Sequence, residues 1–426
     1  MTVNQQPQTS FFADLHLHSP FSMATSPNAT IADYVIHAQL TGLSMIGTGD
    51  ILHPYWRAQL AELLEEVAPG TYQCHLPEQV VETIPRLCRR QIRILATTEI
   101  NLRFRLHDKT YQFHLLMIFP SISHADRLAT QLRSRGIDLK SDGRPTVTMA
   151  PRDFSVLVRE TVPRTLLIPA HIWTPWFGIL GARTGYNSLQ EGFEDEVHHL
   201  AAIETGLSSD APMNALLSTL DSIPFVAFSD AHSPHSLARN CTEFIEVPPD
   251  FSGVERCLRQ FPGYALRTFH EYPQLGKYYH DGHRKCDVSC APSPAAPNRR
   301  ERCPRCGRPL TIGVLHRVLL LADRTSPNLA NRRWEYTLPL PKLVAIATHK
   351  GEKTKCVGNL CTRLRQLFGP DLLLLREVPA GYLRDAGYPQ IAEVLTAFRE
   401  RRLQITPGFD GRFGALKMPD STRKGA

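Results

Sequence analysis

Side chains that commonly bind divalent metals recur at or near the ends of short apolar segments in the first 270 residues. Two of them form His16-Leu17-His18, and residues i and i+2 of a strand point to the same face, so both imidazoles aim at one place. The full set is His16, His18, Asp50, Glu99, His114, His171, Asp230 and His232. One such histidine alone is more often a core residue, but a set distributed over successive strands indicates a multinuclear metal site.

Imidazole nitrogens combined with carboxylate oxygens suit Zn²⁺, Mn²⁺, Mg²⁺ or Fe²⁺, and the lack of thiolates in this set argues against a purely structural zinc. We expect two or three ions, with Glu99 as the bridging carboxylate. Two ions ~3.5–4 Å apart can activate water and hold both oxygens of an in-line displacement, a chemistry used mostly to cleave phosphate esters. We assign catalytic roles to His16, His18, Asp50, Glu99, His171, Asp230 and His232, and a ligand role to His114.

A second cluster of metal-binding residues lies beyond residue 280. Cys303-Pro304-Arg305-Cys306 is a typical zinc knuckle, and Cys286 precedes it. His283 and Cys290 compete for the fourth ligand position. The other cysteines are scattered, which favours reduced thiols and one structural zinc over a disulfide scaffold.

The same region concentrates positive charge. Asp281–Trp334 holds eleven Lys or Arg residues against four Asp or Glu residues, an excess that equals the net charge of +7 for the whole chain. Such a field suits a polyanion such as nucleic acid, although a solvated basic surface is an equal alternative. The candidate phosphate contacts are Arg305, Arg308, Arg317, Lys350, Lys353 and Lys355, the lysines in a glycine-containing turn between two predicted helices.

Apolar segments alternate with amphipathic ones from Phe11 to about Phe269. The expected strands are Phe11–Leu15, Leu43–Gly47, Ile92–Glu99, Tyr111–Phe119, Thr165–Ala170, Ala201–Glu204 and Phe225–Phe228. The helical patterns between them are Ile31–Leu40, Trp56–Val67, His124–Ser134, Asp153–Glu160 and Pro212–Leu220. This alternation predicts an α/β barrel, a fold that places its active site at the carboxyl ends of its strands. His114 lies inside its segment and would have to point inward.

Composition divides the chain into four predicted regions: a disordered N-terminus (1–10), the barrel (11–270), a zinc-finger module (271–325) and a basic helical region (326–426). The Pro- and Ala-rich stretch Ala291–Arg300 is expected to be a flexible insertion. Later helices are expected at Ile312–Ala322, Pro341–Thr348, Val357–Phe368 and Gln390–Arg401. No apolar run reaches the ~18–20 residues of a membrane span, and the N-terminus lacks a signal pattern. We therefore expect a cytoplasmic, nucleoid-associated protein with no membrane partner.

Four motifs resemble those of the polymerase and histidinol phosphatase (PHP) superfamily, whose members are distorted (β/α) barrels that hold two or three metals and hydrolyse phosphoesters. The motifs are Asp14-Leu15-His16-Leu17-His18-Ser19, Gly47-Thr48-Gly49-Asp50, Ala170-His171 and Ser229-Asp230-Ala231-His232. The superfamily's usual Thr-Asp-His after the second strand is absent. Asp50 stands at the histidine's place, which implies a carboxylate ligand and a different metal preference.

Motifs at the junction of the barrel and the zinc-finger module resemble one particular family. Asp281-Gly282-His283-Arg284-Lys285-Cys286, the string from Cys303 to Val318, and the tail motif from Pro407 to Gly414 resemble the endonuclease Q family. The resemblance implies a barrel, a zinc module and a mainly helical C-terminal domain. It also implies a repair endonuclease that cuts damaged double- or single-stranded DNA 5′ of uracil, hypoxanthine, xanthine or an abasic site. A sliding clamp and other repair proteins are candidate partners.

Recognition of a damaged base requires a nucleotide to leave the stack, which needs aromatic wedges. Trp173 and Trp176, just beyond His171, are candidates for DNA contact, with core packing as an equal alternative. A phosphatase acting on a small phosphorylated metabolite remains the alternative function, and a DNA-binding adaptor is a third.

Overall fold

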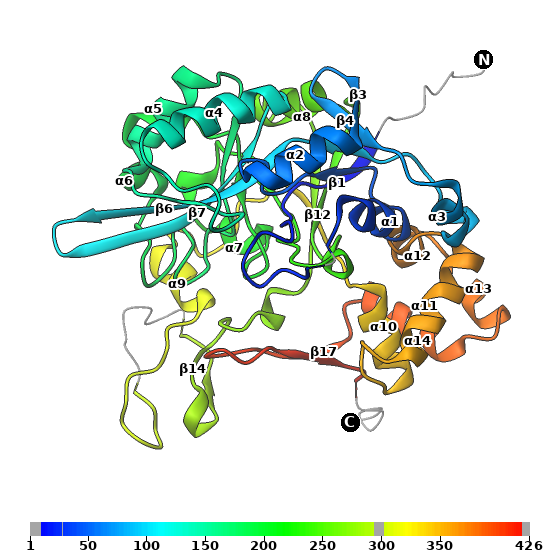
Figure 1. The fold of residues 1–426 in the computed structure, drawn as a ribbon. Helices are drawn as coiled ribbons and strands as arrows, with labels where there is room; N and C mark the ends of the chain where they lie inside the picture. The colour runs from blue at the N-terminus through cyan, green and yellow to red at the C-terminus, as the bar shows by residue number, and fades with distance from the viewer. Residues whose placement is uncertain (1–9, 28, 294–301, 420–426) are drawn as a thin grey trace, which may run out of the picture.

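A computed structural model describes residues 10–27, 29–293 and 302–419 (Figure 1). The predicted disordered N-terminus therefore lies outside the described residues, except for Ser10, which begins the first strand. Most of the predicted insertion, from residue 294 onward, also lies outside them. Within the described part of the chain, no helix has both the length and the apolar character needed to cross a membrane.

The protein has a mixed α/β fold built on two main sheets. The larger has eight strands in the order β16 (Arg333–Tyr336), β13 (Leu266–His270), β12 (Cys241–Ile245), β1 (Ser10–Asp14), β2 (Met45–Gly47), β5 (Arg93–Leu95), β4 (Thr71–Cys74) and β3 (Leu64–Ala68). The smaller has four: β8 (Thr146–Val147), β6 (Thr97–Leu106), β7 (Lys109–Ile118) and β9 (Leu166–Pro169). A parallel pair, β10 (Ile203–Glu204) and β11 (Phe225–Val226), follows.

Backbone contacts outside these ladders link the sheets around a common interior. The Phe119 amide donates to the Ala96 carbonyl at 2.9 Å, next to the ends of β7 and β5. Leu167 in β9 pairs with Leu200, and Leu17 after β1 pairs with Ala231 after β11. The described strands thus surround the interior as a distorted barrel without forming one continuous closed sheet.

Alternating residues of the barrel strands enter two different cores. Met45, Leu95 and Leu116 belong to the inner cluster, whereas their neighbours Ile46 and Ile94 belong to the cluster that packs beneath the helices. This period of two follows from the pleat of a strand, and burial on both faces explains why the segments are apolar throughout. The helices around the barrel are α1 (Ile31–Thr41), α2 (Pro54–Leu63), α3 (Glu78–Thr83), α4 (Ile122–Ser134), α5 (Pro151–Thr161), α6 (Leu189–Phe193), α7 (Ala211–Asn214) and α8 (Phe251–Arg259).

Each of the seven expected strands coincides with an observed strand, although Ile92–Glu99 contains both β5 and the start of β6, and β12 and β13 were not predicted. Two helices end earlier than expected. The predicted helix Trp56–Val67 stops at Leu63, because Leu64–Ala68 forms β3 and pairs with β4 across the Pro69-Gly70 turn. Gly70 has a φ of +70°, and its amide donates to the Glu66 side chain at 2.7 Å, so this turn is specified locally. The predicted helix Pro212–Leu220 is a four-residue α-helix followed by a separate 3-10 turn.

The C-terminal half contains a small module and a helical region. The module is built on the hairpin of β14 (Asp281–His283) and β15 (Val288–Cys290) and is followed by α9 (Val314–Leu321). The helical region has its own apolar core and comprises α10 (Leu340–Thr348), α11 (Lys355–Phe368), α12 (Asp371–Arg376), α13 (Ala380–Asp385) and α14 (Pro389–Arg399). A final hairpin of β17 (Gln404–Thr406) and β18 (Ala415–Lys417) runs between the helical region and the module (Figure 1).

Candidate metal centre and nucleic-acid interface

The carboxyl ends of the barrel strands bring the predicted ligands together. His16 and His18 follow β1, Asp50 follows β2, His171 follows β9 and Asp230 follows β11. Three of these residues have a positive φ: 45° at Asp50, 28° at His171 and 49° at Asp230. Non-glycine residues rarely adopt this conformation, and where they do the strain often marks a functional site.

Glu99 and His114 reach the same point from the long hairpin of β6 and β7. Glu99 pairs with Leu116, and His114 lies two residues from Leu116 in β7, so both side chains lie on one face of the hairpin. His114 therefore points inward, as the sequence analysis required. The distal half of the hairpin extends away from the barrel (Figure 1).

The first of two groups of potential ligands comprises His16, His18, Glu99 and Asp230. Its ligand atoms all lie within 4.8 Å of one another. The Nε2 atom of His18 lies 3.0 Å from Asp230 Oδ1 and 3.4 Å from Glu99 Oε2. His16, His18 and Glu99 are fully buried, and the Asp230 side chain is 20 % exposed, so the group opens to solvent beside Asp230.

The second group comprises Glu99, His114 and His171. Glu99 Oε1 lies 2.9 Å from His114 Nδ1 and 3.1 Å from His171 Nε2. Glu99 thus belongs to both groups, with one carboxylate oxygen facing His114 and His171 and the other facing His18. This geometry supports the predicted bridging role of Glu99.

Asp50 and His232 lie beside these groups and are not members of them. Asp50 Oδ1 contacts Nδ1 of His18 at 3.1 Å, and its Oδ2 accepts hydrogen bonds from Ser19 and Ser22. The carboxylate therefore holds the ring of His18 with Nε2 facing Glu99. The His232 ring centroid lies 4.4 Å from that of His18 at the more exposed edge. Direct metal ligation by Asp50 or His232 stays a prediction.

Two residues that the sequence analysis missed complete the site. Glu204, at the end of β10, contacts His16 Nδ1 at 3.0 Å and accepts a hydrogen bond from the His171 amide at 2.8 Å. Arg144 donates to Glu99 Oε2 at 3.0 Å. Glu204 ends one of the predicted strands, as most of the ligands do, and this position was the available signal. Arg144 lies in a loop with no motif.

The buried charges favour a bound cation. Burial alone lowers the pKa of His16, but the carboxylates of Glu204 and Glu99 outweigh it and hold that pKa well above its ordinary value. Burial raises the pKa of Glu99, yet the neighbouring His114 and His16 hold it well below its usual range. The carboxylates therefore stay ionised, and the field that would hold protons on the imidazoles equally attracts a divalent ion.

The donor atoms also fit a metal. His16 Nδ1 is engaged by Glu204, while its Nε2 is buried without a hydrogen-bond partner in the described structure and faces Glu99. A carboxylate that fixes one ring nitrogen and leaves the other directed inward is the usual arrangement behind a metal-bound histidine. The residues placed to hold ions are His16, His18, Glu99, His114, His171 and Asp230.

The zinc-type cluster has a defined set of four residues. Atoms of His283, Cys286, Cys303 and Cys306 lie within 4.8 Å of one another. Burial raises the pKa of the Cys303 thiol, but hydrogen bonds from the Arg305 backbone and the His283 side chain lower it to about 6, which favours the metal-binding thiolate. Between the two predicted competitors, the geometry therefore favours His283 over Cys290.

Replacing His283 by alanine should remove zinc from the module, whereas Cys290→Ser should retain it. His283 supplies one of the four clustered ligand atoms, and Cys290 is outside that group. Zinc content per chain, measured by mass spectrometry after exhaustive dialysis, checks both variants. A Cys290→Ser protein without zinc, beside a zinc-replete His283→Ala protein, would reverse the assignment.

The aromatic residues considered for DNA contact differ in how far they are exposed to solvent. Trp173 is fully buried and donates its ring N–H to Asn214 at 2.8 Å, which contradicts a DNA-contacting role from this position. Trp176 is half-buried and packs edge-on against Tyr278. Phe177, which was not singled out, is 39 % exposed and stacks on His114. Of these three rings, Phe177 is therefore the one that the structure places against a residue of the centre.

The arginines predicted to contact phosphate also differ in their exposure and hydrogen bonding. Arg305 and Arg308 are exposed on the zinc knuckle. Arg317 instead donates to the carbonyls of Leu180 and Tyr186, at 3.0 and 2.8 Å, and so joins α9 to the barrel. These bonds use Nε and Nη2 and give Arg317 a structural role, while its predicted contact with phosphate stays a prediction.

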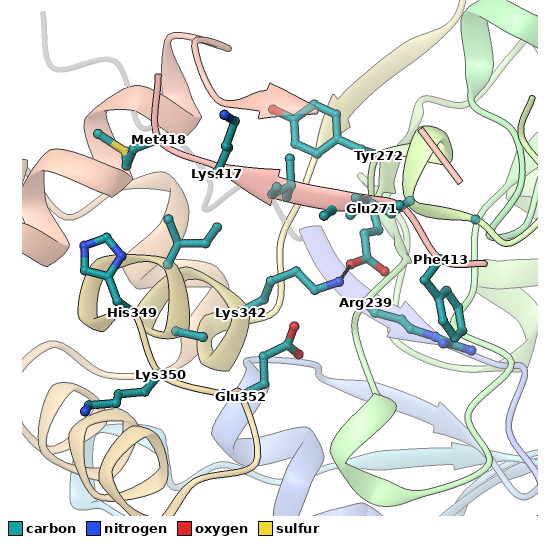
Figure 2. Close-up of a pocket in the computed structure, with 18 of the residues that line it drawn as sticks. Arg239, Glu271, Tyr272, Lys342, His349, Lys350, Glu352, Phe413, Lys417 and Met418 are labelled. Carbon is teal, nitrogen blue, oxygen red and sulfur yellow. Dashed lines mark hydrogen bonds and ion pairs between the residues drawn. The ribbon is translucent and has the colours of Figure 1, made fainter. Parts of the chain in front are cut away.

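The predicted lysine turn borders a cavity of about 1130 Å³ between α10, β18 and residues 271–276 (Figure 2). Lys350 and Lys353 line it, whereas Lys355 is exposed at the start of α11. Arg239 lines the same cavity and donates to the backbone carbonyls of Ser229 and Asp230, at 2.8 and 3.2 Å. The cavity is therefore basic and adjoins the candidate metal centre.

The fold and the ligand groups together define a mixed α/β protein with a candidate metal centre at the carboxyl ends of its barrel strands. No family model matches the chain. The uncharacterized protein YqxK of Bacillus subtilis (strain 168) is 24% identical over 419 residues, which cover 95% of this chain and 99% of the relative.

Two solved structures match the fold over nearly its whole length. The lesion-specific endonuclease PfuEndoQ from Pyrococcus furiosus has a TM-score of 0.83 and 26% identity, with 98% of both chains covered. A structure of endonuclease Q in complex with a 27-mer duplex carrying an abasic lesion at the active site has a TM-score of 0.82 and 26% identity, with 97% of both chains covered. The resemblance to endonuclease Q and the expected fold class are thereby confirmed.

Proposed function

We propose that this protein is a metal-dependent DNA repair endonuclease of the PHP type. It hydrolyses the phosphodiester 5′ of a deaminated base (uracil, hypoxanthine or xanthine) or of an abasic site and leaves a 3′-hydroxyl and a 5′-phosphate. The observation that carries the proposal is the pair of ligand groups that share Glu99, set in a fold that matches endonuclease Q along its whole length. Its place of action is the cytoplasm, on nucleoid DNA.

Different residues of the chain hold the ions, orient the ligands and mark the side of substrate approach. When bound, two or three divalent ions would activate a water and neutralise charge on the oxygens of the scissile phosphate. Glu204 and Asp50 orient His16 and His18, so the ligand set is fixed before substrate arrives. The partly exposed Asp230 and His232 mark the side from which a phosphodiester can approach.

The basic surface supplies affinity for the DNA backbone. Arg305 and Arg308 on the zinc knuckle are exposed, and Lys350 and Lys353 border the cavity beside the centre. Contacts of this kind release counterions, so affinity falls steeply with salt. Phe177 stacks on His114 and Trp176 packs against Tyr278, and both are candidate supports for an extruded nucleotide.

Substrate class is tested by offering the Mn²⁺-loaded protein a lesion-containing duplex and, separately, small phosphomonoesters. We expect the duplex to be cut and the phosphomonoesters to be left intact. Duplex affinity should also fall with salt with a log–log slope of about −0.9 per phosphate contacted. Turnover of phosphomonoesters with no salt-dependent DNA binding would replace the proposal with the metabolite phosphatase.

A further inference from the structure

The loop from Ser141 to Pro145 is fixed over the candidate metal centre. The Gly143 amide donates to the Phe21 carbonyl at 2.9 Å, and the Pro145 carbonyl accepts from the Asn101 amide at 3.0 Å. A Cβ atom at Gly143 would lie 2.4 Å from Asp50 Oδ2, so only glycine fits this close approach. The loop is thus held against the residue that orients His18.

This loop places Arg144 at the mouth of the centre. Its guanidinium lies 3.0 Å from Glu99 Oε2, the oxygen that also faces His18. The Arg144 side chain is 20 % exposed, whereas Glu99 is fully buried. Within the described residues, the guanidinium donates its side-chain hydrogen bond to Glu99. One N–H therefore reaches inward, and donors remain on the side open to solvent.

We propose that Arg144 is a catalytic residue that binds a non-bridging oxygen of the scissile phosphate. This inference rests on the proposed phosphodiester chemistry of the centre. A planar guanidinium recognises phosphate through parallel hydrogen bonds, and Glu99 holds this one in place before substrate binds. Charge that develops on the phosphate would meet a cation that is already fixed in position.

Binding of inorganic phosphate to the Mn²⁺-loaded protein tests this directly, because the readout does not depend on DNA cleavage. Arg144→Met should weaken phosphate binding by about 10- to 100-fold, the loss of a hydrogen bond between charged groups. Arg144→Lys should recover part of the affinity. Arg135→Met is the matched control, because Arg135 is exposed at the end of α4, bonded to Gln131, and should behave as wild type.

The manganese content of Arg144→Met shows whether Arg144 binds substrate or only supports Glu99. Arg144→Met should hold as much manganese as the wild type. If the variant instead loses manganese, Arg144 supports Glu99 and the inference fails. Unchanged phosphate affinity at equal manganese content would also overturn it.

Sulfur substitution identifies the atom contacted. A duplex with one deoxyuridine is prepared with either phosphorothioate diastereomer at the scissile position. In the wild type, sulfur at the oxygen facing Arg144 should slow cleavage, and Arg144→Met should erase that stereospecific penalty, because contacting groups are non-additive. Equal penalties in both proteins would contradict the contact. If the wild type cuts no duplex while phosphate binding still depends on Arg144, the proposed substrate is wrong and the role of Arg144 stands.

Discussion

Asp230→Ala is expected to lower the rate of DNA cleavage by about 10³-fold or more while leaving affinity for the duplex within about twofold. Asp230 Oδ1 lies 3.0 Å from His18 Nε2 and 3.7 Å from His16 Nε2, at the side of the ligand group that opens to solvent. Its loss removes an ionised ligand beside the reacting phosphate. The residues proposed to grip the DNA backbone lie on other elements.

Single-turnover cleavage and equilibrium binding, measured on the same lesion duplex, check this expectation. Asp126→Ala is the matched control, because Asp126 is an exposed carboxylate on the outer helix α4, paired with Arg57. Cleavage by Asp230→Ala within tenfold of the wild type would remove Asp230 from the centre. Loss of binding together with cleavage would contradict the separation of catalytic and DNA-gripping residues.

Glu99→Gln is expected to lower the rate of DNA cleavage about as strongly as Asp230→Ala does. The substitution keeps the side chain's shape but removes the charge that both ligand groups share. The carbonyl oxygen of an amide is a weaker ligand than a carboxylate, and the neighbouring histidines lose the anion that holds their ring nitrogens. We expect the barrel to lose at least one ion per chain and cleavage to fall by about 10³-fold.

Metal content per chain, counted separately from the zinc of the finger module, measures this effect. Thermal unfolding of the variant distinguishes a missing ion from a misfolded barrel, because a folded protein keeps a cooperative transition. Glu196→Gln is a suitable control, since Glu196 is a buried carboxylate bonded to Ser155 and Arg159 on the barrel's outer side. Full metal occupancy in Glu99→Gln would show that the two groups do not share this residue.

The barrel and most of its centre could be predicted because their signals are local. Each strand is a short apolar run, and the ligand lies at or just after its end, so His16, His18, His171 and Asp230 are found by position alone. The helix predicted through Val67 failed because the Pro69-Gly70 turn carries the stronger local signal.

The remaining features depend on distances that only the folded chain sets. Asp50 is predicted to be a ligand in a histidine's place, which stays a prediction, but its contact with Nδ1 of His18 could not be predicted from the sequence. Arg144 reaches Glu99 from a loop forty-five residues away in sequence. Trp173 and Trp176 are three residues apart, but one is buried against Asn214 and the other is half-buried against Tyr278. Residue type alone does not distinguish the buried tryptophan from the half-buried one.

The most direct test of the proposed function is the position of the cut in an end-labelled duplex that carries one deoxyuridine, with an undamaged duplex of the same sequence beside it. With Mn²⁺, Mg²⁺ or Zn²⁺ added, we expect a single cut immediately 5′ of the deoxyuridine, a 3′-hydroxyl that a polymerase extends, and an intact control. A cut elsewhere, equal cleavage of both duplexes, or no cleavage with any of these metals would contradict it.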